Sequence, residues 1–179
     1  MAGHSDNDLG LPDFADPVKV MIVIAAYYTR IADAQLASAR SALDAAGAAH
    51  ETVEVPGSLE IAPAIALAER LSNFDGYVAL GCVIRGATSH YDVVVSESAR
   101  GLTLLGLQGA AIGNGIITVD TIAQAEERAD AGRLNTAGGA AAAALHLIAL
   151  ARRFGSGRKA VGFTGNIQIA GEDGGPATA

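Results

Sequence analysis

The stretch Gly81–Asp92 holds the residues of this chain that are best suited to chemistry. An apolar strand is expected to end there, and two small residues, Gly86 and Ala87, lead into the start of a helix. Backbone N–H groups at a helix N-terminus favour an anion, and the hydroxyl of Thr88 adds a donor. His90 follows within one turn and can transfer protons near neutral pH. The pattern predicts a phosphate site beside a proton-transfer group, or equally a helix start with a histidine that faces solvent.

Two more segments with chemical potential follow expected strands. Pro56–Glu60 is a second strand-to-helix turn with exposed backbone amides, although a glutamate such as Glu60 most often only complements the helix dipole. Tyr27 follows the first strand and could stack on a flat heterocycle, although an aromatic residue at a strand end more often packs at the rim of the core. Arg128 lies on a short polar helix, where a solvated charge is the ordinary interpretation.

The composition excludes several classes of protein. The net charge of −7 argues against a nucleic-acid binder, which needs a basic face, but one or two arginines suffice for a small anionic substrate. The single cysteine, Cys82, excludes an internal disulfide framework, and no histidine has the spacing of a metal ligand. No apolar run is long enough to span a membrane and no signal-peptide pattern is present, so we expect a cytoplasmic protein.

Strands and helices are predicted to alternate along the chain. The expected strands are 18–24, 50–55, 77–83 and 111–118. The expected helices are 31–46, 59–71, 89–105, 122–131 and 139–154, of which the last is rich in alanine and able to pack closely against a flat surface. Ser58 is expected to cap the second helix, and Gly47 to end the first. This order predicts an α/β fold with a parallel sheet, in which ligands bind at the carboxyl ends of the strands.

The chain is predicted to form one domain over residues 17–154. A flexible polar arm at 1–16 precedes this domain, and a glycine-rich tail at 155–179 follows it. Only 17% of the residues are charged, which favours buried contacts between subunits.

Three segments of the sequence, in this order, resemble motifs of the lumazine synthase family, which is also called the riboflavin synthase beta-chain family. Val83–Asp92 is similar to the family's most specific motif, and Val55–Ile61 resembles its second. Gly113–Thr118 is similar to the family's fourth-strand segment, with Asn114 where many members have an aromatic residue. The resemblance covers residues 18–154.

The resemblance implies a flavodoxin-like three-layer α/β/α sandwich around a four-stranded parallel sheet. It implies a transferase that condenses 5-amino-6-(D-ribitylamino)uracil with 3,4-dihydroxy-2-butanone 4-phosphate to 6,7-dimethyl-8-ribityllumazine in riboflavin biosynthesis. It further implies a homopentamer, with a decamer or a 60-mer as larger assemblies, and active sites between neighbouring subunits. Neither metal nor organic cofactor is expected, riboflavin synthase is the candidate protein partner, and neither nucleic acid nor a membrane is an expected partner.

The resemblance also implies a role for each matching residue. His90 corresponds to the proton-transfer histidine, and Tyr27 to the aromatic residue that stacks on the pyrimidine. The other positions implied for the uracil and ribityl groups are Ser58, Leu59, Glu60, Val83, Ile84 and, from the neighbouring subunit, Asn114. The positions implied for the phosphate are Gly86, Ala87, Thr88, Arg128 of the neighbouring subunit, and Thr136.

Thr136 is the one departure from the family's phosphate motif. Family members usually have a lysine here, and the loss of an ammonium group removes a charge-assisted hydrogen bond worth ~1.5–3 kcal/mol. Arg133 is a candidate substitute for it. The alternative function is that of a weakly active or non-catalytic paralogue, which would bind flavin or lumazine or serve as a shell.

Overall fold

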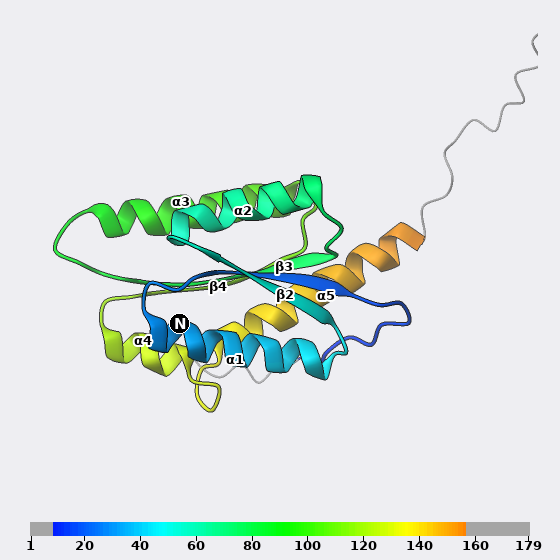
Figure 1. Ribbon diagram of the computed structural model, residues 1–179, viewed down its shortest axis with the longest axis horizontal. Helices are drawn as coiled ribbons and strands as arrows, with labels where there is room; N and C mark the ends of the chain where they lie inside the picture. The colour runs from blue at the N-terminus through cyan, green and yellow to red at the C-terminus, as the bar shows by residue number, and fades with distance from the viewer. Residues whose placement is uncertain (1–8, 157–179) are drawn as a thin grey trace, which may run out of the picture.

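The structure, a computed structural model, describes residues 9–156 (Figure 1). Four strands form one parallel sheet in the order β2-β1-β3-β4, with β1 Lys19–Ala25, β2 Ala49–Val55, β3 Gly76–Ile84 and β4 Ile112–Val119. The helices are α1 Thr29–Ala45, α2 Ser58–Leu71, α3 His90–Leu107, α4 Ile122–Ala129 and α5 Thr136–Ser156. The predicted α/β fold is confirmed, and the strand order is the one that flavodoxin-like sheets share.

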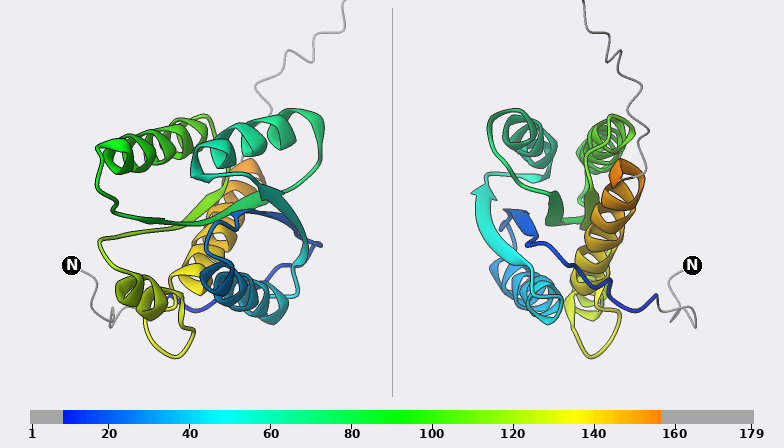
Figure 2. Two further views of the ribbon diagram at one scale, coloured as in Figure 1. Left: turned by 60° about the vertical axis from the view of Figure 1, so that its left-hand side comes forward. Right: turned by 90° about the vertical axis from the view of Figure 1, so that its right-hand side faces the viewer.

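The helices cover both faces of the sheet, which gives three layers (Figures 1 and 2). Helices α1, α4 and α5 lie on one face, and α2 and α3 lie on the other. Because side chains alternate along a strand, neighbouring residues of β1 enter different layers. Ile24 is buried in the α1 and α5 layer, and Val23 is buried in the α2 layer. Residues 20–25 are therefore all buried and apolar, as expected for a central parallel strand.

Helix α5 packs closely on β4, as its alanine content predicts. A Cβ at Gly113 would overlap the Ala140 backbone, and a Cβ at Gly115 would lie 3.1 Å from the Ala140 side chain. The two glycines of β4 and the small residues of α5 therefore permit this approach. Larger side chains at these positions would separate the two elements.

The two predicted helix caps have different outcomes. Gly47, with a φ of +65°, ends α1 as expected, since its N–H donates to the Asp44 carbonyl and the next N–H donates to Leu43. The prediction that Ser58 caps α2 is wrong. Helix α2 begins at Ser58 itself, Gly57 holds the cap position, and no side chain caps this end. The Ser58 side chain is instead buried within the fold.

The boundaries between the last two helices also differ from the prediction. Helix α4 ends at Ala129 rather than 131, because Asp130 begins a turn in which its carboxylate accepts from the Gly132 N–H at 2.8 Å. Helix α5 begins at Thr136 rather than 139, because Asn135 caps it: the Asn135 side chain accepts from the Gly138 N–H at 3.2 Å. Side chains of the preceding turns therefore override the expected helix limits.

Residues 9–16, the described part of the predicted arm, form no helix or strand but contact α5. The Arg152 guanidinium donates to the carbonyl groups of Asp16 and Pro17, and it lies 5.4 Å from the centre of the Phe14 ring. His146 Nε2 lies 3.2 Å from the Leu9 carbonyl oxygen. The first eight residues and the predicted tail from 157 onward lie outside the described residues. Within residues 9–156, no helix is long and apolar enough to cross a membrane.

Candidate active site

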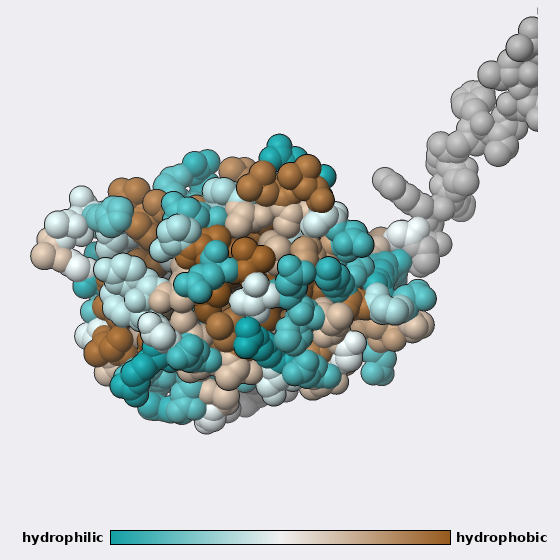
Figure 3. All heavy atoms as spheres, viewed as in Figure 1, coloured by the Kyte–Doolittle hydropathy of each residue, from teal (hydrophilic) through white to brown (hydrophobic). Residues whose placement is uncertain are grey.

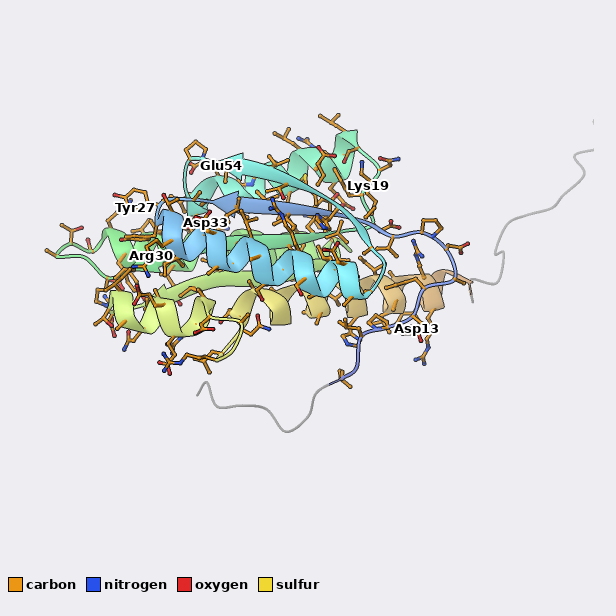
Figure 4. The ribbon with its side chains drawn as sticks, turned by 60° about the horizontal axis from the view of Figure 1, so that its bottom comes forward. Asp13, Lys19, Tyr27, Arg30, Asp33 and Glu54 are labelled. Carbon is orange, nitrogen blue, oxygen red and sulfur yellow. The ribbon has the colours of Figure 1, made fainter. Side chains whose placement is uncertain are left out.

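The predicted site segments follow the carboxyl ends of the strands, at one edge of the sheet. Because β1 lies between β2 and β3, the residues after β1 lie between the turn that follows β2 and the loop that follows β3. Figure 4 shows Tyr27 and Arg30 at this edge and Lys19 at the opposite end of the sheet. The Tyr27 side chain is 77% exposed and meets the Tyr28 ring edge-on at 5.0 Å, so one of its faces is free to stack.

The turn after β2 contacts β3 through one hydroxyl group. Ser58 is buried, and a Cβ built at Gly81 would lie 3.1 Å from its Oγ. Glu60 is exposed, and its carboxylate folds back over the helix start, because a Cβ at Gly57 would lie 2.9 Å from Glu60 Oε2. This carboxylate therefore complements the N-terminus of α2, as its ordinary interpretation predicts. Leu59, between the two, is partly exposed at this edge.

The loop after β3 offers backbone donors. Gly86, Ala87 and Thr88 are exposed, and within the described residues their N–H groups make no hydrogen bond. His90 is the first residue of α3 and is also exposed, and no side chain caps this helix end. Free N–H groups and the positive end of a helix dipole can hold a phosphate. Val83 and Ile84, the last two residues of β3, are half-buried apolar residues just before the loop.

Arg85 has no predicted role, yet it makes most of the polar contacts that hold this loop. Its Nε donates to Asp120 Oδ1 at 2.9 Å, and its Nη1 donates to Asp92 Oδ1 at 3.1 Å. Its guanidinium carbon lies 4.1 Å from the centre of the Tyr91 ring. The hydrogen bond to Asp120 raises the pKa of Arg85 above its ordinary value. The signal in the sequence was an arginine inside the most specific motif.

Asn114 lies apart from the other predicted residues of the same chain. It pairs with Ala79 in the middle of the sheet, five residues before the end of β4, which is roughly 16 Å along a strand. It lines a groove of about 350 Å³ between α3, β4 and α5. Its Oδ1 accepts from the Ile116 N–H at 3.0 Å, which covers one open donor of this edge strand.

The residues predicted to bind phosphate from a neighbouring subunit lie on or after α4. Arg128 is half-buried and donates to the Gln124 carbonyl of its own helix at 3.2 Å. Thr136 is half-buried at the first position of α5. Arg133, the candidate substitute for the missing lysine, donates to Glu127 Oε1 at 2.9 Å. It lines a separate groove of about 920 Å³ between α1 and α4.

Two buried polar groups lie beneath the site. The amide of Gln35, which is fully buried, donates to the Gly81 carbonyl at 3.1 Å and to the Gly115 carbonyl at 2.9 Å. Its Oε1 has no partner within the described residues. Burial raises the pKa of the Cys82 thiol to about 11, so this thiol stays protonated and packs as a small apolar residue. Gln35 carried no sequence signal, since its partners are backbone atoms of distant strands.

These features define an α/β protein of the flavodoxin-like class, with the predicted site segments at the carboxyl edge of its sheet. The family model described as 6,7-dimethyl-8-ribityllumazine synthase matches residues 17–152. The chain belongs to this family.

Several curated relatives carry the same description. A protein of Jannaschia sp. (strain CCS1) is 73% identical over 172 residues, which cover 95% of this chain and 97% of the relative. One of Sphingopyxis alaskensis is 55% identical over 77% of this chain and 98% of its own length. One of Bartonella tribocorum is 52% identical over 78% of this chain and 93% of its own length. Each of these is described as 6,7-dimethyl-8-ribityllumazine synthase.

Proposed function

We propose that this chain condenses 5-amino-6-(D-ribitylamino)uracil with 3,4-dihydroxy-2-butanone 4-phosphate to 6,7-dimethyl-8-ribityllumazine, a transferase reaction of riboflavin biosynthesis. The family match and the 73% identical relative support the reaction. The observation that carries the assignment of the site is the β3–α3 loop, where three exposed N–H groups without partners in the described residues precede His90. This chemistry requires two things of the protein: a site that binds the phosphate group of the substrate and a side chain that transfers protons.

The reaction needs orientation and proton transfer more than a strong nucleophile. The substrate amine attacks the ketone carbonyl and forms an imine with loss of water. Elimination then releases phosphate, and ring closure onto the ribitylamino nitrogen releases a second water. His90 can accept and return the protons of these steps, because a neutral imidazole carries one nitrogen that accepts a proton and one that donates it. The N–H groups of Gly86, Ala87 and Thr88 hold the leaving phosphate.

The pyrimidine and its ribityl chain occupy the other half of the proposed site. Tyr27 stacks on the pyrimidine with its exposed ring, and Val83 and Ile84 form an apolar wall. Ser58, Leu59 and Glu60 line the turn that receives the ribityl chain. Two substrates held side by side react as if at a much higher concentration, so this orientation provides most of the rate enhancement.

The test is formation of lumazine, followed by its absorbance, with purified full-length protein and both substrates. We expect turnover above the uncatalysed condensation, and we expect His90→Ala to lower kcat by about 10- to 100-fold. His146→Ala is the matched control, because His146 lies on α5 and contacts the Leu9 carbonyl instead of the site edge. Tight binding of flavin or lumazine without turnover would contradict the proposal and would favour the non-catalytic alternative.

We further propose that the complete site forms between neighbouring chains of a homopentamer. Asn114 lies too far along β4 to meet Tyr27 and His90 of its own chain, so in this proposal a second chain supplies it. The same second chain supplies Arg128, as the resemblance to the family implies. Large apolar side chains are exposed on α3 and α5, the two helices that line the groove of Asn114, namely Leu104, Leu107, Leu147, Leu150 and Phe154. Sedimentation equilibrium should give a mass of five chains or a multiple of five, and a monomer would contradict the proposal.

The far face of the α2 and α3 layer is a second place where chains could meet. Leu67 and Leu71 are 51% and 79% exposed at the end of α2, and Figure 3 shows apolar atoms gathered over this end. A pairing of pentamers into a decamer, or their closure into a 60-mer, would need such a surface. Riboflavin synthase, which consumes the product, is the protein partner that we propose.

A further inference from the structure

We propose that Arg85 is a positioning residue, which fixes the loop of residues 86–89 that is proposed to bind phosphate. Its positive charge also offsets two carboxylates that would otherwise repel the phosphate. This inference rests on the proposed function, because it assigns a role beside the same site. Arg85 has no role among the predicted site residues.

One guanidinium group joins three elements around the loop. Its Nε binds Asp120, the residue directly after β4, at 2.9 Å. Its Nη1 binds Asp92, in the first turn of α3, at 3.1 Å, and its plane covers Tyr91. The Arg85 N–H also donates to the Val119 carbonyl at 2.9 Å, which continues the β3–β4 ladder to this point. The loop residues 86–89 are therefore anchored at both ends by Arg85, through its backbone N–H and its side chain.

The anchor extends to the start of α4. The Asp120 N–H donates to Gln124 Oε1 at 2.9 Å, and Gln124 forms the capping box of α4 with Thr121. A movement of Asp120 would therefore disturb the first turn of α4 as well as the loop. Arginine suits this role because its planar fork keeps two hydrogen bonds and one ring contact at once, which a lysine ammonium cannot do.

The charges give Arg85 a second effect. Asp92 and Asp120 place two negative charges beside the loop that is proposed to bind phosphate, and Arg85 contacts both. Without it, the carboxylates would face an incoming phosphate group uncompensated. A neutral residue at position 85 should therefore weaken binding of the phosphate substrate more than binding of the uracil substrate.

Arg85→Gln tests both effects, with Arg100→Gln as the matched control. Arg100 is also exposed and also bound to a carboxylate, since its Nε donates to Glu97 at 2.8 Å, but it lies further along α3. We expect Arg85→Gln to raise KM for the butanone phosphate about tenfold while KM for the uracil substrate stays within about twofold. For Arg85→Lys, the KM for the butanone phosphate should lie between those of the unaltered chain and Arg85→Gln. Arg100→Gln should have both KM values of the unaltered chain.

A second variant separates electrostatics from general damage. Arg85→Gln combined with Asp120→Asn removes one of the uncompensated carboxylates, so it should recover part of the lost affinity for the phosphate substrate. A purely structural role predicts no recovery, because the double variant lacks even more of the anchor. The inference would be overturned if Arg85→Gln raised both KM values equally and lowered Tm, or if it left the KM for the phosphate substrate unchanged. Turnover by the unaltered chain would still support the proposed function in either case.

Calorimetric titration with inorganic phosphate distinguishes this inference from the proposed function. If the unaltered chain forms no lumazine, the proposed function fails, and phosphate affinity still tests Arg85. Weaker phosphate binding by Arg85→Gln than by the unaltered chain and Arg100→Gln supports the role. Equal binding by all three, or no binding by the unaltered chain, overturns it.

Discussion

The Ser58 hydroxyl lies directly over Gly81, where a Cβ would approach its Oγ to 3.1 Å. This contact joins the first residue of α2 to β3, the strand that leads into the loop proposed to bind phosphate. A Cβ at position 81 would press on Ser58, whereas Ile61 Cδ1, 3.4 Å away, would be in ordinary contact with it. Gly81 is thus required by the approach of a neighbouring side chain and not by its backbone angles.

Gly81→Ala should therefore shift Ser58 and weaken binding of the ribityl substrate. A displacement of a few tenths of an ångström is enough to disturb a hydrogen bond, so we expect KM for the uracil substrate to rise about threefold to tenfold. Crowding should also lower the free energy of unfolding by about 1 kcal/mol. Steady-state kinetics and chemical denaturation measure the two effects. Gly155→Ala is the control, because nothing lies within 4 Å of a Cβ there. Unchanged KM in Gly81→Ala would show that Ser58 does not touch the substrate.

Thr136→Lys should strengthen binding of the phosphate substrate. The change restores the ammonium group that family members usually carry here, and a charge-assisted hydrogen bond could lower KM for the butanone phosphate about tenfold. Stability should fall slightly, since a cation at the first position of α5 opposes the helix dipole. Thr136→Gln, of similar length but uncharged, should show no gain in affinity. A KM that stays constant in Thr136→Lys would mean that another group, such as Arg133, already provides the charge.

The strands could be predicted from the sequence because apolar, β-branched runs identify buried parallel strands. The helix limits were less accurate because side chains decide them: Asp130 ends α4, and Asn135 starts α5 three residues early. The site segments could be proposed from the sequence because each loop at a strand end is continuous along the chain. The contacts of Gln35 and the bond between Arg85 and Asp120 could not be predicted in this way, because they join residues that lie far apart in the sequence.

Gln35→Met should leave stability unchanged or raise it. The Gln35 side chain is fully buried, and its Oε1 has no partner within the described residues, so the amide loses hydration without full compensation. Methionine fills a similar volume without polar atoms, and we expect the free energy of unfolding to rise by up to about 1 kcal/mol. Gln35→Glu has the same shape but places a carboxyl group there, so it should be strongly destabilising. Chemical denaturation compares the free energy of unfolding of the three chains. A large decrease of this free energy in Gln35→Met would show that the two hydrogen bonds of Gln35 outweigh the cost of its unpaired oxygen.

Cys82→Ala should reduce the loss of stability in alkaline solution. Burial raises the pKa of the Cys82 thiol from its ordinary value of 9.0 to about 11, so between these pH values the unfolded chain releases a proton that the folded chain keeps. The unfolded state then binds fewer protons, and the free energy of unfolding falls as pH rises, by about 2 kcal/mol at pH 10.5. Below pH 9 the thiol is protonated in both states and contributes no pH dependence. We therefore expect the fall in Tm between pH 8 and pH 10.5, measured by calorimetry, to be smaller in Cys82→Ala. Tyr77, whose pKa burial also raises, is present in both chains and cancels from the comparison. An identical fall in both would show that the thiol ionises as readily in the folded chain as in the unfolded one.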